Sequence, residues 1–262
     1  MKVKGMGKRN ASKYPCGGEL GMNPWTQMWL NYFPRAAKGN EAYFEKYRLD
    51  GFEKEHCVIR SALMELERGI RGMLVLPPPV HSSLAQAEKG TFVIRRISEA
   101  GSGVKTEGYH LKEQDGRLFL MAVEEKGVLY GVFDLLRRIA MEESLKGVDV
   151  LCNPDNPNRM LNHWDNMDGS IERGYSGESF FFAENEILVN ERTRDYARFV
   201  ASVGLNGVVI NNVNVKDAAT YLITERYFDR VAELSNVFAD YGIRLYLSLN
   251  FASPMELGGP DS

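Results

Sequence analysis

Four carboxylates lie close together in a part of the sequence that begins like a buried strand and continues without a helical period. The stretch LNHWDNMDGSIERGYSG contains Asp165, Asp168 and Glu172, and Glu178 follows directly. Two carboxylates set across a glycosidic bond are the usual machinery of glycoside hydrolysis. An acid and a base need separate environments, however, and catalytic pairs in barrels usually come from different strands. The favoured interpretation of these four is therefore solvated loop charge, or an ion pair with Arg173.

Trp164 is the more informative residue of this stretch. An indole face stacks on the apolar face of a sugar ring, while polar neighbours bind the hydroxyl groups. A structural tryptophan buried beneath the end of a strand explains the same residue equally well. The sequence alone leaves both interpretations open.

Other chemistries lack the residues that they need. Gly101-Ser102-Gly103 has no third glycine and precedes no helix, and neither a Walker loop nor an HExxH motif is present. The histidines are too scattered for a zinc site, and no GxSxG elbow accompanies them. They are His56, His81, His110 and His163. The sequence therefore predicts no metal and no cofactor.

Composition narrows the class of protein further. The chain has 262 residues, of which 44% are hydrophobic and 26% charged, with a formal net charge of -3. This balance gives no reason to expect a nucleic-acid surface or a polybasic membrane patch. The amino terminus lacks an apolar signal region, and no stretch approaches a transmembrane span. Three dispersed cysteines favour a reducing compartment, so we expect a cytoplasmic protein.

The first half of the chain predicts a small α/β sandwich, assigned to residues 1–152. An amphipathic helix is expected over 57–74, where apolar residues share one face, and a second over 128–139. A strand over 91–97 and a hairpin turning on Asp115-Gly116 complete the pattern. The apolar face of the first helix comprises Ile59, Leu63, Leu66 and Ile70.

The second half, after a linker of prolines and asparagines, alternates strands and helices. Its elements are strands over 159–164, 207–215 and 243–250 and helices over 193–203 and 223–242. Helix-length spacers between short apolar strands imply parallel strands with right-handed crossovers. We therefore predict an α/β fold in which residues 158–262 form the first three strands of an incomplete (β/α)8 TIM barrel.

Each of these strands ends in polar residues. The carboxyl ends of parallel strands carry the site in barrels and doubly wound sheets. Asparagines also fill turns, but three successive strands that end this way favour a functional site. The polar residues are Asn162, His163 and Asp165 on the first strand, Asn211, Asn212 and Asn214 on the second, and Asn250 on the third.

The residues also resemble a known family. RMLNHWDNMDGSIERGYSG resembles the signature of the α-glucuronidases of glycoside hydrolase family 67, and RDYARFVASVGLNGVVINNVN and YLSLNFASPMELGG resemble the segments that follow it. Upstream, MELERGIRGML, EGYHL and GVLYGVFDLLRRI resemble the family's amino-terminal α/β domain. The resemblance runs from about residue 40 to the end.

The resemblance implies a (β/α)8-barrel enzyme that removes glucuronic acid, or its 4-O-methyl form, from xylo-oligosaccharides in xylan degradation. Inversion of configuration and the absence of a metal are implied as well. Trp164 maps onto the tryptophan that lines the uronic-acid pocket, and Val213 onto a valine near the methylated side of the sugar. The general acid, the base and the groups that grip the uronate come from later strands, beyond residue 262.

We therefore expect the chain to be a fragment or truncated form of an α-glucuronidase, inactive alone, that binds a glucuronic-acid-bearing xylo-oligosaccharide. The alternative is a non-catalytic module that binds carbohydrate or assembles with the missing remainder of the barrel. The predicted substrate-binding residues are Trp164, Asp165, Asn212, Val213, Asn214 and Asn250.

Overall fold

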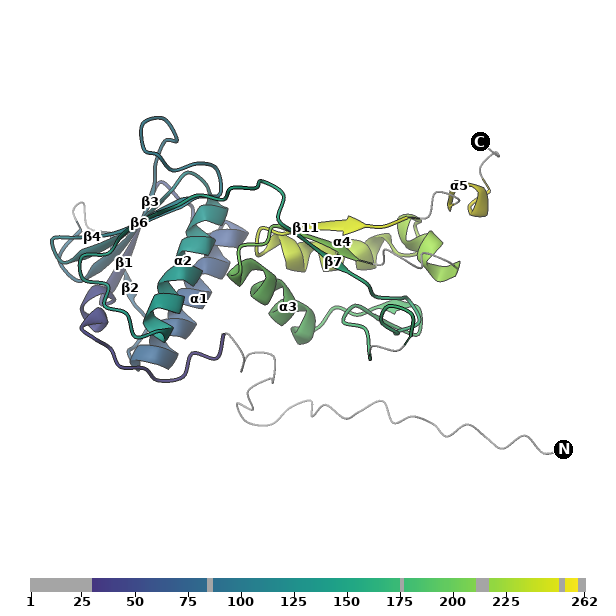
Figure 1. The fold of residues 1–262 in the computed structure, drawn as a ribbon, viewed down its shortest axis with the longest axis horizontal. Coiled ribbons are helices and arrows are strands. Elements are labelled where there is room, and N and C mark those ends of the chain that lie inside the picture. The colour runs from purple at the N-terminus through teal and green to yellow at the C-terminus, as the bar shows by residue number, and fades with distance from the viewer. Residues whose placement is uncertain (1–29, 84–86, 175–176, 211–216, 250–252, 259–262) are drawn as a thin grey trace. The chain divides into compact units, whose positions relative to one another are not determined.

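The computed structural model describes residues 30–83, 87–174, 177–210, 217–249 and 253–258. Contacts divide the chain into Met1–Asn31 and Tyr32–Ser262, and every described helix and strand lies in the second unit (Figure 1). No helix in the described residues is long and apolar enough to cross a membrane. The fold is mixed α/β and includes a sheet of parallel strands.

A six-stranded mixed sheet forms the first half of this unit, in the order β2-β1-β3-β5-β4-β6. β1 pairs in parallel with β2 and β3, β3 pairs in parallel with β5, and β4 is antiparallel to β5 and β6. The predicted hairpin is confirmed, because Asp115 and Gly116 join β4 to β5 with φ angles of 53° and 74°. The strands are β1 (Lys46–Asp50), β2 (Val80–His81), β3 (Thr91–Arg96), β4 (Tyr109–Gln114), β5 (Arg117–Ala122) and β6 (Asp149–Cys152).

Two helices, α1 (Cys57–Leu74) and α2 (Glu125–Ala140), lie side by side next to this sheet (Figure 1). Both were predicted from their apolar periodicity, and Ile59, Leu66 and Ile70 are buried as expected. Leu63 is only half-buried, because it faces a groove beside α1. A short 3-10 helix, η1 (Asn40–Tyr43), precedes β1.

Gly127 permits a close approach of α2 to the loop before β4. A Cβ atom at this position would lie 2.2 Å from the carbonyl oxygen of Gly108, a backbone atom that cannot rotate away. Although alanine favours a helix, we expect Gly127→Ala to lower the free energy of unfolding by about 1–3 kcal/mol through overpacking. Urea unfolding measures this change. Glu67→Ala on the exposed side of α1 is the control, and equal stabilities of both variants would contradict the prediction.

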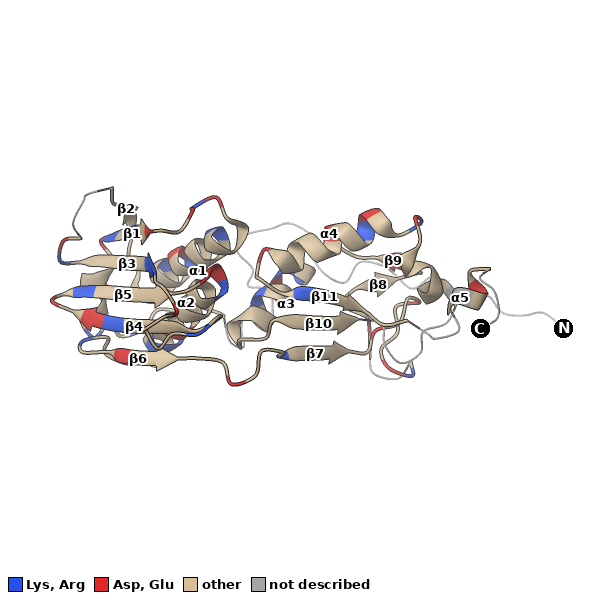
Figure 2. Cartoon of the chain, turned by 90° about the horizontal axis from the view of Figure 1, so that it is seen from above, with Lys and Arg blue, Asp and Glu red and all other residues tan. Residues whose placement is uncertain are grey.

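The second half contains a three-stranded parallel sheet in the order β11-β10-β7 (Figure 2). These strands are β7 (Met160–His163), β10 (Gly207–Ile210) and β11 (Arg244–Leu247), and all three were predicted. The part of the second predicted strand after Ile210 lies outside the described residues. The helices of this half are α3 (Glu191–Ser202), α4 (Phe228–Ala239) and α5 (Ser253–Glu256).

Two features of this half differ from the sequence prediction. The helix expected over 223–242 is shorter, since α4 follows a separate 3-10 helix, η2 (Asp217–Ile223). A small hairpin of β8 (Phe182–Ala183) and β9 (Glu186–Ile187) was not predicted, because two-residue strands give no alternation to detect. At the start of α3, Asn190 and Thr193 form a capping box.

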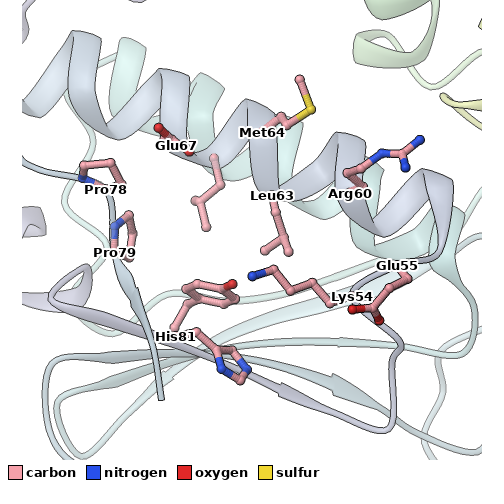
Figure 3. A pocket seen from close by; sticks show the side chains of 11 residues that line it. Lys54, Glu55, Arg60, Leu63, Met64, Glu67, Pro78, Pro79 and His81 are labelled. Carbon is pink, nitrogen blue, oxygen red and sulfur yellow. The ribbon is translucent and has the colours of Figure 1, made fainter. Parts of the chain in front are cut away.

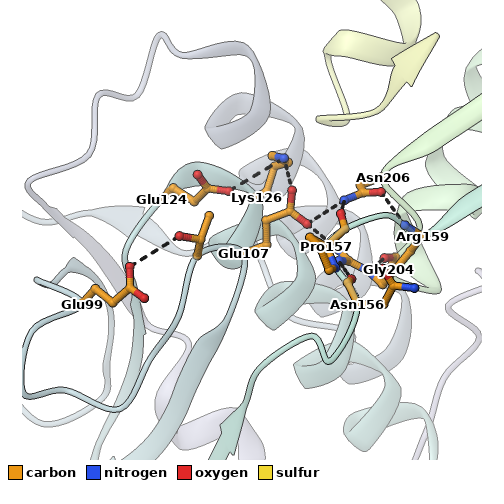
Figure 4. Close-up of polar contacts among 10 residues, drawn as sticks. Glu99, Glu107, Glu124, Lys126, Asn156, Pro157, Arg159, Gly204 and Asn206 are labelled. Atoms are coloured by element: carbon orange, nitrogen blue, oxygen red, sulfur yellow. Dashed lines mark hydrogen bonds and ion pairs between the residues drawn. The ribbon is translucent and has the colours of Figure 1, made fainter. Parts of the chain in front are cut away.

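Glu107 connects the two sheets through the linker (Figure 4). Its Oε2 accepts hydrogen bonds from Arg159 Nη2 at 2.5 Å and from Asn206 Nδ2 at 2.9 Å, and Lys126 contacts Oε1. Burial alone raises the pKa of Glu107, but the hydrogen bonds from Lys126, Arg159 and Asn206 outweigh burial and lower it. We call these four residues the Glu107 junction. The predicted boundary between residues 152 and 158 falls in this linker and stays a prediction.

Candidate functional site

The register of the parallel sheet brings three strand ends to one edge. His163, Ile210 and Leu247 occupy equivalent positions at the carboxyl ends of β7, β10 and β11. Trp164 follows β7 directly, and 38% of its surface is exposed. The indole is therefore available at the edge where sites of parallel sheets lie. This exposure excludes a fully buried structural role, and the predicted contact of Trp164 with a sugar stays a prediction.

Of the six predicted substrate-binding residues, the structure describes two. Trp164 and Asp165 lie at the end of β7, whereas Asn212, Val213, Asn214 and Asn250 lie outside the described residues. Their predicted roles stay predictions. Asn162 belongs to β7 itself and pairs in register with Val209 of β10.

Asp165 is buried, with 1% of its surface exposed, and its contacts are internal. Oδ2 accepts hydrogen bonds from the Ser179 hydroxyl and from the backbone N–H of Phe180 at 2.8 Å and of Phe181 at 3.2 Å. His163 Nε2 lies 2.7 Å from Oδ1. We call His163, Asp165 and Ser179 the Asp165 cluster. Its geometry anchors the chain after Trp164, and the predicted contact of Asp165 with substrate stays a prediction.

The electrostatics of Asp165 agree with this anchoring role. Burial alone raises the pKa of a carboxyl group, but His163, the Ser179 hydroxyl and the Phe180 N–H favour the charged form more strongly. The pKa of Asp165 is therefore lowered, and the group is a carboxylate at neutral pH. A buried carboxylate that is ionised at neutral pH is poorly suited to serve as a general acid there.

Three residues with the composition of a hydrolase triad meet in the Asp165 cluster, but in a different order. The Ser179 hydroxyl donates to Asp165 rather than to an imidazole, and Ser179 itself is buried. His163 Nδ1 lies 3.1 Å from the hydroxyl of Tyr196 on α3. A nucleophilic serine needs a base on its own oxygen. The arrangement thus holds a loop and does not activate a nucleophile.

The same loop is fixed on the other side of Trp164. The carbonyl oxygen of Trp164 accepts a hydrogen bond from Glu172 N at 2.8 Å, and Asn166 Nδ2 donates to the carbonyl oxygen of Glu172 at 2.7 Å. An antiparallel bridge pairs Asp165 with Ile171. The backbone that carries the indole is thus held by both ends of the loop, which limits the positions that Trp164 can adopt.

The remaining carboxylates of this stretch have local roles or face solvent. Asp168 Oδ1 accepts hydrogen bonds from the backbone N–H and the hydroxyl of Ser170, and these bonds lower its pKa. Glu178 is exposed. Among the described residues, no group of three or more His, Cys, Asp or Glu side chains could hold a metal ion. The sequence interpretation missed Ser179 and Tyr196, because contacts so distant along the chain leave no spacing signal.

Family models match almost the whole described chain. The model of the glycosyl hydrolase family 67 N-terminus matches residues 28–135, and the model of the family's middle domain matches residues 138–262. The chain belongs to glycosyl hydrolase family 67. The resemblance inferred from the sequence motifs is thereby confirmed.

Curated relatives of this family 67 chain carry the name α-glucuronidase. A probable α-glucuronidase A of Aspergillus terreus is 36% identical over 243 residues, which are 88% of this chain and 28% of the relative. The probable α-glucuronidase A of Aspergillus oryzae is 41% identical over 211 residues, 77% of this chain and 25% of the relative. The family 67 chain thus spans about a quarter of the length of these relatives.

Solved structures of other glycosidase families share the fold. A family GH115 4-O-methyl-α-glucuronidase with specificity for decorated arabinogalactans superposes with a TM-score of 0.53 and 14% identity, over 83% of this chain and 31% of that one. An N-acetyl-β-hexosaminidase of Streptomyces plicatus gives a TM-score of 0.53 and 16% identity, over 83% and 43%. At these identities the likeness concerns the fold alone.

Proposed function

We propose that this family 67 chain forms the amino-terminal α/β domain, residues 1–152, and the first three strands of a (β/α)8 barrel, residues 158–262, of an α-glucuronidase. The parallel order of β7, β10 and β11 supports the barrel assignment. The scattered cysteines support a cytoplasmic location. The enzyme removes glucuronic acid, or its 4-O-methyl form, from xylo-oligosaccharides with inversion.

In this proposal, the loop after β7 forms one wall of the uronic-acid pocket. The observation that carries it is the exposed indole of Trp164 on a backbone that the Asp165 cluster and the Glu172 bond hold in place. A fixed aromatic face binds the apolar side of a sugar ring with little loss of conformational entropy. Asn212, Val213, Asn214 and Asn250 are proposed as further contacts from the neighbouring strand ends.

The catalytic acid and base are proposed to lie outside these 262 residues. The relatives are roughly four times as long as the segment that they share with this chain, which leaves room for the later strands. In addition, the one buried carboxylate at the described strand ends, Asp165, is committed to internal contacts. The chain by itself is therefore proposed to bind part of the substrate without cleaving it.

A chimera tests this function. The chain is joined to the remaining sequence of the Aspergillus terreus relative, and release of glucuronic acid from an aldouronic acid is measured. We expect activity from the chimera and none from the 262-residue chain. Trp164→Ala in the chimera is expected to lower kcat/KM by roughly ten- to a hundredfold, since burial of an aromatic side chain contributes about 1.5–3 kcal/mol.

The control for this experiment is Trp164→Phe, which keeps an aromatic face and should retain much of the activity. Equal activity of the alanine variant and the parent chimera would show that Trp164 does not contribute to substrate binding in the pocket. Release of glucuronic acid by the 262-residue chain would overturn the proposed location of the catalytic carboxylates and return attention to Asp165 and Glu172.

A second candidate is a module without catalytic activity that assembles with a polypeptide completing the barrel. The apolar surface near the three-stranded sheet favours it, since Met160 and Leu161 on the edge strand β7 and Phe199 on α3 are exposed. In this case the separate remainder of the relative, added to the chain without a covalent link, would restore the activity seen with the chimera.

A further inference from the structure

A groove opens beside α1, over the β1 and β2 edge of the six-stranded sheet (Figure 3). Its volume is about 600 Å³, which lies in the range of small-molecule sites. Leu63 and Leu66 line it from α1, Pro78 and Pro79 lie beside the Glu67 end of that helix, and Tyr47 and His81 contribute rings from β1 and β2. No lining residue belongs to the loop that carries Trp164.

The two rings present apolar surfaces at an angle to each other. The ring centroids of Tyr47 and His81 are 5.1 Å apart, and the ring planes are inclined by 60°. Tyr47 is buried in the floor, whereas His81 is exposed at the mouth. Such a corner, with proline and leucine walls, suits a ligand with a flat or ring-shaped apolar face.

Lys54 places a positive charge in this groove. Figure 3 shows its side chain extending beneath Leu63 toward the middle of the groove. Other lysines of the sheet region have carboxylate partners: Lys46 pairs with Glu88 at 2.8 Å and Lys112 with Asp149 at 2.9 Å. Within the described ranges, no ion pair or hydrogen bond of the Lys54 ammonium is found. Lys54 is exposed, so its ammonium can reach an anionic ligand that enters the groove and form a charge-assisted hydrogen bond with it.

Two of the other charged residues that line the groove form ion pairs within the described part of the chain, unlike Lys54. Arg60 Nη2 lies 3.5 Å from Asp240 Oδ1, and Glu67 Oε1 lies 3.5 Å from Arg71 Nη1, so both have partners of opposite charge. Glu55 lies at the end of the groove, where its carboxylate can accept hydrogen bonds from hydroxyl groups (Figure 3). Besides the paired Arg60 and Glu67, the groove thus combines the Lys54 ammonium, the Glu55 carboxylate and two rings.

We propose that this groove is a second carbohydrate site, which binds a short saccharide that carries one carboxylate. The sugar ring lies against Tyr47 and His81, the carboxylate pairs with Lys54, and Glu55 accepts hydrogen bonds from the hydroxyls. The choice of a uronic acid among carboxylate-bearing sugars rests on the proposed function. The site itself rests on the groove and is independent of Trp164.

Leu63 offers a direct readout, since its side chain points into the groove toward Lys54 (Figure 3) and carries methyl groups visible by NMR. The chain is labelled with ¹³C at its leucine methyl groups, and Leu63→Met assigns the signals. Aldobiouronic acid, a glucuronic acid linked to xylose, is the probe, and xylobiose is the neutral analogue. We expect aldobiouronic acid to shift the Leu63 signals in a saturable manner, and xylobiose to leave them in place at equal concentration.

Lys54→Gln is expected to weaken this binding about tenfold, because it removes a charge-assisted pair and keeps the length of the side chain. Lys105→Gln, at another exposed lysine, is the matched control and should bind as the parent chain does. His81→Ala, at an exposed ring, provides a second variant of the groove and should also weaken binding. Circular dichroism of all variants verifies the fold.

Three outcomes would overturn the proposal: Leu63 signals that do not respond to aldobiouronic acid, an equal response to xylobiose, or unchanged affinity in Lys54→Gln. Trp164→Ala separates this site from the pocket of the proposed function. If the Leu63 response persists in that variant while the chimera with Trp164→Ala keeps full activity, the proposed pocket is wrong and the groove proposal is supported.

Discussion

Asp165→Ala is expected to lower the free energy of unfolding of this chain by about 3–5 kcal/mol, the usual cost of breaking a buried, hydrogen-bonded charge pair. The substitution removes the acceptor for the Ser179 hydroxyl and for the half-buried Phe180 N–H, whereas the Phe181 N–H keeps a second acceptor in Ser179 Oγ at 3.0 Å. It also removes the carboxylate that contacts His163. Urea unfolding, followed by circular dichroism, measures the loss.

Asp168→Ala is the matched control, because Asp168 belongs to the same loop and accepts two hydrogen bonds but is exposed. We expect that variant to lose less than about 1 kcal/mol. Equal losses in the two variants would show that burial of the Asp165 cluster contributes nothing beyond an ordinary loop contact.

The pH dependence of this effect has a defined sign. The pKa of Asp165 is lower in the folded chain than in the unfolded chain, so the carboxylate stabilises the fold above its unfolded pKa. This contribution is lost as the pH falls through the folded pKa. The difference in unfolding free energy between the parent chain and Asp165→Asn should therefore be constant near neutral pH and shrink below about pH 4.

The second large effect is expected at the buried ion pair between α1 and α3. Arg198 Nε lies 2.6 Å from Glu65 Oε1, and the side chain of Glu65 is 0% exposed. Glu65 also accepts hydrogen bonds from the Tyr32 hydroxyl and from Arg68, both at 2.9 Å. We expect Arg198→Met to lower the free energy of unfolding by about 3–5 kcal/mol, because it leaves a buried carboxylate with insufficient compensation.

A double-mutant cycle identifies the origin of this loss. Glu65→Gln combined with Arg198→Met removes both charges, and a neutral pair of similar shape is often tolerated. The double variant should therefore be more stable than Arg198→Met alone. If the two losses were simply additive, the pair would make no specific contribution, and the effect of Arg198→Met would come from lost packing alone.

The long periodic helices of this fold were predictable, and the two-residue strands were not. α1 has apolar residues at helical spacing over 18 residues, and its buried Ile59, Leu66 and Ile70 follow that spacing. By contrast, β2 has two residues, and an alternation so short does not differ from chance. This strand forms because β1 offers backbone partners, which is a tertiary cause.

The same distinction applies to the candidate site. Trp164 could be selected from its residue type and its place after a strand, but its exposure required the structure. Asp165 was selected for the same reasons. Its hydrogen-bond partner Ser179 is 14 residues away, however, and no local sequence pattern predicts that contact. The groove beside α1 could not be predicted, since it brings Tyr47, Lys54 and His81 together through the pairing of β1 with β2.

The sequence separations in these contacts bear on the order in which the chain folds. The bond between Ser179 and Asp165 closes a loop of 14 residues, whereas the bond between Asn206 and Glu107 spans 99. Loop-closure entropy makes the longer span more costly by about 1.7 kcal/mol. We therefore expect the loop after Trp164 to form early during folding and the Glu107 junction to form late. Each half of the chain would then reach its structure before the hydrogen bonds of Glu107 fix the linker.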